Sequence, residues 1–295
     1  MTKKRFFNLR NGIVTIAICL AGSATMFAQS NTTDEEVVIN GVKWATRNLD
    51  VGGTFVENQE DSGALFQWGR RADGHEIRTY VFSTTTLADS DIPGHANFIC
   101  APSYPWDWRS PQNDALWNAG TESAPVKSAN DPSPSGWRVP TATEIDKLLD
   151  ETKVGREYVE NSENKFIGIK FTDKDNTDNS VFFPITDVIR HHNESTGFNS
   201  SSGYYFTSTP SDIYARCLGF NSSGAEVGDL ARACGRSVRP IADNTNTSIN
   251  EVSTDTENAV VTGYFDILGR KLNEEPTQGF YIIRYSNGTS KKVVR

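Results

Sequence analysis

The stretch that most clearly indicates the fold reads Asn130-Asp-Pro-Ser-Pro-Ser-Gly-Trp-Arg-Val-Pro-Thr-Ala-Thr-Glu144. Thr141 and Glu144 have the spacing of a capping box, in which a hydroxyl and a carboxylate satisfy unpaired backbone amides at a helix start. Pro140 prevents the helix from extending backward. An apolar face follows at positions i, i+3 and i+4, formed by Ile145, Leu148 and Leu149. The stretch therefore predicts one helix, starting at Thr141, that docks on a sheet.

On both sides of this helix, short apolar runs alternate with clusters of Gly, Asn, Ser and Pro, from Val37 to about Ala242. This pattern is typical of many short strands joined by long loops. The expected strands are Val37–Ile39, Val42–Trp44, Ala64–Trp68, Lys165–Phe171, Ser180–Thr186, Gly203–Thr209, Ala215–Asn221 and Arg236–Ile241. We therefore expect residues 37–242 to form one globular domain of mixed, mostly β structure.

A second, smaller unit is expected at the C-terminus. Residues 243–258 are polar and almost without aromatic side chains, which is typical of a linker. Phe280–Tyr285 and Thr289–Val294 then flank Ser286-Asn287-Gly288, and Asn-Gly between apolar runs is a strong hairpin signal. Residues 259–295 are therefore predicted to form a small all-β module.

The N-terminus has the order of a signal peptide. A basic start is followed by an uncharged apolar run from Ile13 to Ala24 and by the small residue Ala28 before Gln29. The alternative is a membrane anchor, but the run is shorter than the ~20 residues that span a bilayer. We predict residues 1–28 to be a cleaved signal, which leaves no membrane span in the exported chain.

Net charge excludes two classes of partner. The formal charge of the whole chain is −8, and residues 1–28 carry four basic side chains and no acidic one, so cleavage would bring it to −12. Nucleic-acid binding needs a basic surface, and so does electrostatic attachment to anionic lipid. Neither partner is expected.

Three cysteines follow the predicted signal: Cys100, Cys217 and Cys234. Export leads to an oxidising environment, and Cys217 and Cys234 both lie in strand-like segments near the end of the domain. A bond between them would stabilise the fold by about 3 kcal/mol in the chain-entropy model. The alternative is three buried, unpaired thiols.

Motifs for common catalytic chemistries are absent from the sequence. It contains no Gly-x-Ser-x-Gly elbow, phosphate loop, dinucleotide fingerprint or His-Glu-x-x-His. His191 and His192 with Glu194 have metal-ligand composition, but adjacent strand residues face opposite ways, so a solvated loop is favoured. Residues 173–179 have calcium-ligand composition but lack the required glycine and closing glutamate, so a polar hairpin is favoured. We expect no metal, no cofactor and no enzymatic activity.

Aromatic side chains gather in a Pro- and Asn-rich segment, where they offer a large contact area at a low entropic cost. Exposed, they would stack on sugar rings or on a protein partner. The alternative is that they fill the core beneath a long loop, since Trp is highly buried on average. The candidate binding residues are Tyr104, Trp106, Trp108 and Trp117.

Five sequence blocks in order resemble the FISUMP family, the major paralogous domain of many exported bacterial proteins. The blocks are Ile39–Leu49, Gly63–Gly69, Asn130–Thr141, Gly203–Thr209 and Gly235–Ile241. Ser133 stands where the family usually has Cys. The blocks at the helix start and the domain end are also similar to those of formylglycine-generating enzymes, whose catalytic cysteines have no counterpart here. The resemblance implies an α+β, loop-rich, mostly antiparallel C-type-lectin-like domain with one main helix, whose first and last strands pair.

Residues 248–295 resemble the C-terminal sorting modules of type IX secretion. The matching segments are Tyr264–Leu272, Gly279–Ile283 and Lys291–Arg295. The resemblance implies recognition of the tail by secretion machinery; the alternative is a stability module without a targeting role. The expected protein is a non-catalytic binding or adhesion protein at the outer cell surface or outside the cell, with a glycan or a surface protein as its ligand. A periplasmic location, a fimbrial or matrix subunit, and an enzyme acting on extracellular polysaccharide or peptide remain as alternatives.

Overall fold

The structure is a computed structural model that describes residues 32–78, 82–186, 188–193, 196–198, 201–243, 260–266, 270–277, 280–286 and 290–294. The predicted signal peptide and nearly all of the predicted linker lie outside these residues. In the described part of the chain, no helix has the length and apolar character needed to cross a membrane.

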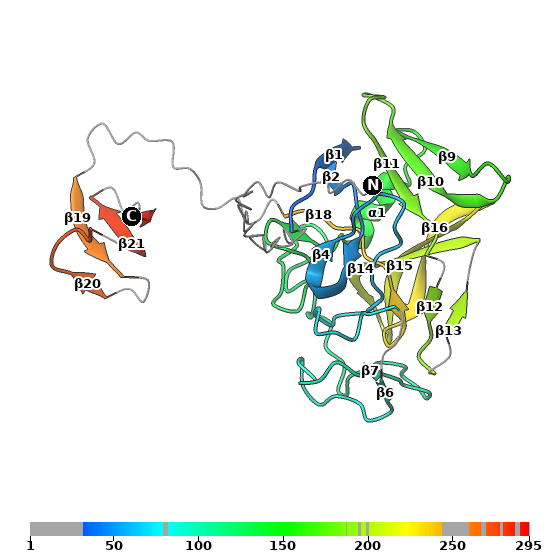
Figure 1. The fold of residues 1–295 in the computed structure, drawn as a ribbon, viewed down its shortest axis with the longest axis horizontal. Coiled ribbons are helices and arrows are strands. Elements are labelled where there is room, and N and C mark those ends of the chain that lie inside the picture. Colours follow the sequence, from blue (N-terminus) through cyan, green and yellow to red (C-terminus); the bar gives the residue numbers. More distant parts are fainter. Residues whose placement is uncertain are drawn as a thin grey trace, which may run out of the picture. The chain divides into compact units, whose positions relative to one another are not determined.

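Antiparallel strands make up most of the globular domain (Figure 1). Its single described α-helix is α1 (Ala142–Leu148), and a 3-10 turn, η1, spans Val51–Gly53. The sheets, in strand order, are β1 (Glu36–Ile39), β2 (Val42–Ala45), β18 (Ile241–Ala242) and β8 (Trp137–Arg138); β11 (Ser180–Pro184), β10 (Phe166–Asp173) and β9 (Val154–Glu160); β13 (Thr196–Phe198), β12 (Val188–Arg190), β17 (Gly235–Arg236) and β5 (Phe66–Gln67); β14 (Ser202–Ser211), β15 (Tyr214–Asn221) and β16 (Gly224–Ala231). The short pairs are β3 (Leu49–Asp50) with β4 (Thr54–Phe55), and the parallel β6 (Ser83–Thr84) with β7 (Phe98–Ile99). The predicted α+β, mostly antiparallel class is confirmed at this level.

The first and last strands of the domain pair, as expected. Ile241 of β18 lies opposite Trp44 of β2 in an antiparallel register. Beside this pair, the buried guanidinium of Arg239 donates to Asn48 Oδ1 at 2.7 Å and to the backbone oxygens of Ala45 and Phe182 at 3.1 and 3.0 Å. One buried side chain therefore connects the domain's closing segment to its opening segment and to β11.

Helix α1 begins where the sequence predicted. Thr141 is the N-cap, and both halves of the capping box are present: Glu144 N–H donates to the Thr141 hydroxyl at 3.3 Å, and Thr141 N–H donates to Glu144 Oε2 at 2.8 Å. Ile145 and Leu148 are buried against the second core cluster, and Leu149, half-buried, packs on the same cluster.

The loop that leads into α1 is fixed by a lysine. Lys127 Nζ donates to the backbone oxygens of Ser133, Pro134 and Trp137 at 2.6, 2.9 and 2.6 Å. Three carbonyl groups thus converge on one ammonium group. This loop is the most specific of the sequence blocks, and its order comes from the chain itself.

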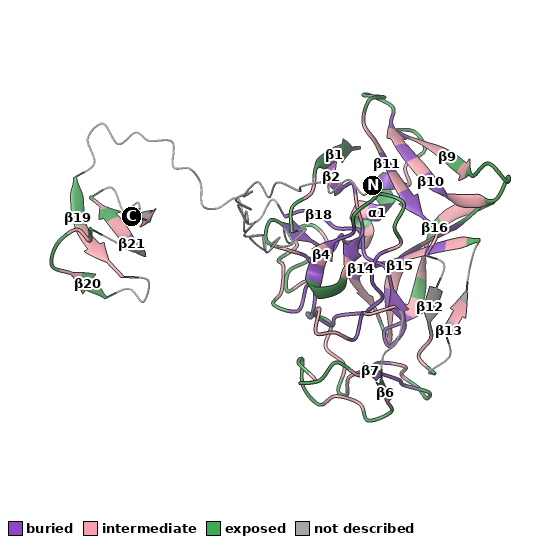
Figure 2. Cartoon of the chain, viewed as in Figure 1, coloured by how far each residue is buried: buried purple, intermediate pink, exposed green. Residues whose placement is uncertain are grey.

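The sheet of β14, β15 and β16 contacts both parts of the core (Figure 2). Phe206 and Cys217 belong to one buried cluster, whereas Tyr205 and Leu218 belong to the other. This division follows from the alternation of side chains along a strand. At one end of the first face, however, Tyr204 is only half-buried.

Most predicted strands are confirmed, with two kinds of difference. The predicted strand Arg236–Ile241 is two separate strands, β17 and β18, because these ends pair in different sheets. Strands β9 and β16 were not expected. β16 contains Gly224 and Gly228, and glycine weakens the strand pattern in a sequence.

The polar segment 173–179 is a hairpin between β10 and β11, as the sequence favoured. The Asp173 carboxylate accepts from the backbone N–H groups of Asn40, Asp175 and Asn176 at 2.7, 2.8 and 3.0 Å. Its oxygens therefore stabilise the turn and connect it to the β1–β2 turn.

The C-terminal module is a sheet of its own, with the strand order β20 (Lys271–Leu272), β19 (Val261–Phe265), β21 (Phe280–Tyr285) and β22 (Ser290–Val294). The predicted hairpin pairing of β21 with β22 is confirmed, and Asn287 and Gly288 of its turn lie outside the described residues. Tyr281 is fully buried, and its hydroxyl donates to Glu275 at 2.6 Å.

Candidate functional site

The four aromatic residues expected to form a contact surface separate into two pairs. Trp108 and Trp117 are buried, and their indole N–H groups donate to the backbone oxygens of Trp68 and Arg70 at 2.7 and 3.2 Å. The prediction that they bind a ligand is therefore corrected: these rings fill the core beneath the loop, because each has both apolar neighbours and a partner for its one polar atom.

Trp106 and Tyr104 remain accessible. Tyr104 is 70% exposed, and its ring meets the half-buried Trp106 edge-on at 5.8 Å between centroids. Trp106 has φ = +56°, in the left-handed region that bulky residues avoid. Its N–H donates to Ser103 O and its own carbonyl accepts from Ala233 N–H, both at 3.0 Å. Two backbone hydrogen bonds thus hold Trp106 in an unfavourable conformation, a kind of strain that clusters at ligand sites.

Trp106 forms part of the wall of a cleft of about 460 Å³, which we call the aromatic cleft. Its ring stacks on Tyr214 at 6.0 Å with an interplanar angle of 27°, and lies 6.0 Å from the ring of His192. The strands contribute Tyr204 from β14, Tyr214 from β15 and Arg236 from β17. The residues that line the aromatic cleft are Trp106, His191, His192, Tyr204, Tyr214, Asp229, Leu230, Ala231, Cys234 and Arg236.

Charged groups in the aromatic cleft are held by neighbours within the protein. The guanidinium of Arg236 lies 5.5 Å from the centre of the Tyr204 ring, within cation–π range. Asp229 is ion-paired with Arg216 at 3.4 Å. The cleft is therefore bordered by both signs of charge and floored largely by aromatic rings.

Arg232, which is fully buried, supports the cleft from below. It donates to the backbone oxygens of Tyr214 and Asp212 at 3.0 and 2.6 Å and pairs with Asp114 at 2.7 Å, while its guanidinium covers the Trp68 ring at 4.5 Å. Asp114 belongs to the aromatic loop and Tyr214 to β15. Arg232 therefore fixes the loop against the strand whose tyrosine stacks on Trp106.

Cys234 and His192 form the one nucleophile-like contact in the cleft, with 3.8 Å between Sγ and Nδ1. Burial raises the pKa of the Cys234 thiol, and burial, followed by the nearby Arg236 charge, lowers the pKa of His192. Both groups are thus held neutral, whereas a thiol nucleophile needs the thiolate.

The predicted Cys217–Cys234 disulfide is not formed in the structure. Both residues are present as buried thiols, and burial raises the pKa of Cys217 to about 12. Cys100 is buried as well, among apolar neighbours that include Ile99 and Ala101. His191 and His192 both line the cleft, and Glu194, the third residue of the suggested metal set, lies outside the described residues.

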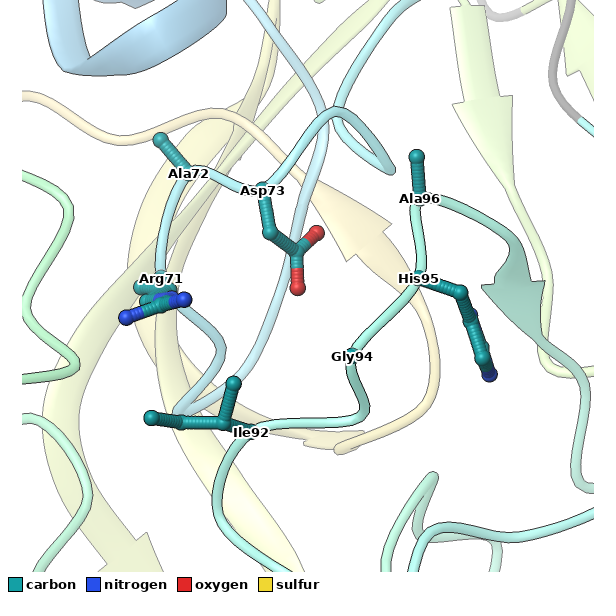
Figure 3. A pocket seen from close by; sticks show the side chains of 7 residues that line it. All are labelled: Arg71, Ala72, Asp73, Ile92, Gly94, His95 and Ala96. Atoms are coloured by element: carbon teal, nitrogen blue, oxygen red, sulfur yellow. The ribbon is translucent and has the colours of Figure 1, made fainter.

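A second depression, of about 580 Å³, lies beside the only group of three potential metal ligands found among the described residues: Asp73, His75 and Glu76. Figure 3 shows the Asp73 carboxylate directed into the space between segments 71–73 and 92–96, while the His95 ring points away from it. Ligand atoms of the three residues lie within 4.8 Å of one another.

Hydrogen bonds within the protein already engage these ligand atoms. His75 is fully buried; its Nε2 accepts from Gln67 N–H at 2.9 Å, so its Nδ1 carries the proton and donates to Asp73 at 2.8 Å. Glu76 accepts from the N–H groups of Gly52 and Gly74 at 2.9 and 2.8 Å. A metal would have to break this network, so we interpret it as structural.

The chain matches no family model, no curated protein and no solved structure. The interpretation of the aromatic cleft therefore rests on the geometry of its own residues.

Proposed function

We propose that the protein is an exported, non-catalytic binding protein whose aromatic cleft holds a carbohydrate. The observation that carries the proposal is Trp106: a half-buried indole kept in a left-handed conformation, stacked on Tyr214 and lining a cavity. Stacking of apolar C–H faces on such rings and hydrogen bonding of hydroxyls to a polar rim suit a sugar.

Binding is favoured over catalysis by the state of the cleft's reactive groups. Asp229 is paired with Arg216, so it does not face a second carboxylate as a glycosidase pair would. The thiol of Cys234 and the imidazole of His192 are both held neutral by burial. These groups can donate or accept hydrogen bonds to a ligand without activation.

The test is Trp106→Ala in the full chain. We expect at least a tenfold loss of affinity for polysaccharide in affinity electrophoresis, because a central aromatic anchor is removed. The matched control is Tyr158→Ala, which removes a 38% exposed aromatic ring from β9, away from the cleft. Equal binding by wild type and Trp106→Ala would refute the proposal.

The scaffold and the route of export are part of the same proposal. A C-type-lectin-like, FISUMP-type domain is supported by the pairing of β2 with β18 and by the capped helix α1. The four-stranded C-terminal sheet is compatible with a type IX sorting module.

Deleting residues 248–295 tests the export step. We expect the full-length protein to be accessible to protease on intact cells and the truncated protein to accumulate in the periplasmic fraction. The same location for both forms would leave the tail without a sorting role.

A further inference from the structure

A third hollow, of about 360 Å³, adjoins the aromatic cleft, and the ring of Tyr204 belongs to the walls of both. The second of the two is lined by Tyr204, Gly219, Phe220, Asn221, Ser223, Gly224, Ala225 and Glu226. It lies over β15 and β16, on the strand hairpin that ends in the aromatic cleft. We call this hollow the glycine trough.

Strand register explains why the trough is open. Tyr204, Gly219 and Glu226 lie opposite one another on β14, β15 and β16. Residues in register share one face of a sheet, so a row that starts with a tyrosine and ends with a glutamate has no side chain at its centre. At Gly219, a Cβ would lie 3.4 Å from the Tyr204 ring, so the trough floor and the ring are in direct contact.

Two further glycines extend this bare floor along β16. A Cβ at Gly224 or Gly228 would meet no atom within 4 Å, and neither residue has a positive φ. No turn geometry therefore requires glycine at these two positions, and packing does not require it either. What their hydrogens leave is surface space on the same face.

The combined length suits an extended ligand. From Gly224 in the trough to Leu230 in the aromatic cleft, β16 runs six residues, which corresponds to about 20 Å. Tyr204 lies where the two hollows meet, with the Arg236 guanidinium 5.5 Å from its ring centre.

We propose that the aromatic cleft and the glycine trough are one groove that takes an uncharged, linear polysaccharide of several sugar units across Tyr204. This inference rests on the proposed function and names the class of ligand. Rings at Trp106, Tyr214 and Tyr204 supply stacking surfaces, while Asn221, Ser223 and Glu226 supply polar partners at the far end.

Charge distinguishes the class of polysaccharide. Glu226 is exposed on the trough, Asp229 borders the cleft, and the whole chain carries a formal charge of −8. Arg236 is positioned over Tyr204. A polyanion such as polygalacturonate would meet net repulsion along this groove, whereas a neutral chain would not.

The first experiment is a size series. The full chain is screened by affinity electrophoresis against mixed-linkage β-glucan, xylan, galactomannan, starch and polygalacturonate, and oligosaccharides of the best binder are then titrated by calorimetry. We expect a neutral polymer to bind best, and affinity to increase stepwise with chain length beyond the length that one hollow accommodates. A plateau at a disaccharide, or a preference for polygalacturonate, would overturn the inference.

The second experiment uses Gly224→Tyr, which fills the trough without contacting another atom at Cβ. We expect about tenfold weaker binding of the longest oligosaccharide and unchanged binding of the shortest. Gly155→Tyr in β9 is the matched control, since its Cβ would make ordinary contact with Thr172 and it lies outside the groove. Melting curves verify folding of both variants, and the size series on the wild-type protein is decisive should Gly224→Tyr not fold.

The two proposals fail in different ways. Binding that is insensitive to Trp106→Ala would remove the aromatic cleft itself. Loss of binding in Trp106→Ala together with wild-type binding of long chains by Gly224→Tyr would keep the aromatic cleft and remove the trough.

Discussion

The Asp73–His75–Glu76 network and the aromatic cleft contain similar residue types and have opposite characters. Each combines a histidine, a carboxylate and an arginine beside a surface hollow. In the first, the histidine and Glu76 are fully buried and hydrogen-bonded to backbone or to each other's neighbours. In the second, Trp106, Tyr204 and both histidines are half-buried and present ring faces to the hollow.

The difference shows that residue type alone does not identify a site. A buried polar group is costly unless it is paired, so a network such as that of His75 stabilises the fold by being complete. A binding surface needs groups whose capacity for contact is only partly used. The following changes test whether the two regions differ in this way, in order of expected effect.

Arg70→Met should have the largest effect. Arg70 is fully buried, pairs with Asp73 at 2.8 Å, and donates to the backbone oxygens of His95 and Asn97 at 2.6 and 2.8 Å. Removing it leaves a partly buried carboxylate and two carbonyls without this partner, so the free energy of unfolding should fall by about 3–5 kcal/mol. Urea unfolding measures the loss. The folded fraction should bind polysaccharide like wild type; impaired binding would instead place function in the network.

Acid should destabilise the protein through His75. Burial, opposed by the hydrogen bond to Asp73, lowers the pKa of His75 below its ordinary value of 6.5, with Arg70 lowering it further and Glu76 raising it. The unfolded state therefore binds the proton more readily, so this stability is complete above about pH 6.5 and is lost as pH falls toward the lower folded-state pKa.

The measurement is urea unfolding of wild type and His75→Gln between about pH 7.5 and about pH 5.5. The variant should be less stable at the higher pH and show a weaker pH dependence. His191 and His192 also have lowered pKa values but are half-exposed, so they should contribute less. An unchanged slope in His75→Gln would assign the pH dependence to the cleft histidines.

The smallest effect is expected between Trp106→Gly and Trp106→Ala. Both remove the indole and should weaken binding equally. Glycine tolerates φ = +56° and alanine does not, so the glycine variant should be more stable by about 1 kcal/mol. Thermal unfolding of the pair compares them directly, and a more stable alanine variant would mean that the backbone at position 106 carries no strain.

Local signals in the sequence predicted the local elements well. The capping box at Thr141 and Glu144, the hairpin of residues 173–179 and the pairing of β21 with β22 each depend on a few adjacent residues, and each is confirmed. β16 was missed because glycines interrupt its apolar pattern, and the split of β17 from β18 because it depends on partners more than 150 residues away.

The candidate site was predictable only in part. Trp106 was expected from its composition-rich loop, but Trp108, two residues on, was indistinguishable from it in the sequence. Tyr204 and Tyr214 join Trp106 through strand pairing across about 100 residues of chain, and no short motif encodes that approach. The adjacent tyrosines 204 and 205 offered one signal, because neighbours on a strand face opposite ways and one of them had to face away from the core.

The pairing of β2 with β18 also has a consequence for how this domain combines with others. Since Ile241 lies opposite Trp44, the chain enters and leaves the domain at neighbouring strands. Such a unit can be spliced into a host loop, repeated in tandem or circularly permuted with a short connector, because its fold needs no distance between the two junctions. Its architecture is that of a cassette, in which one attachment point carries both ends.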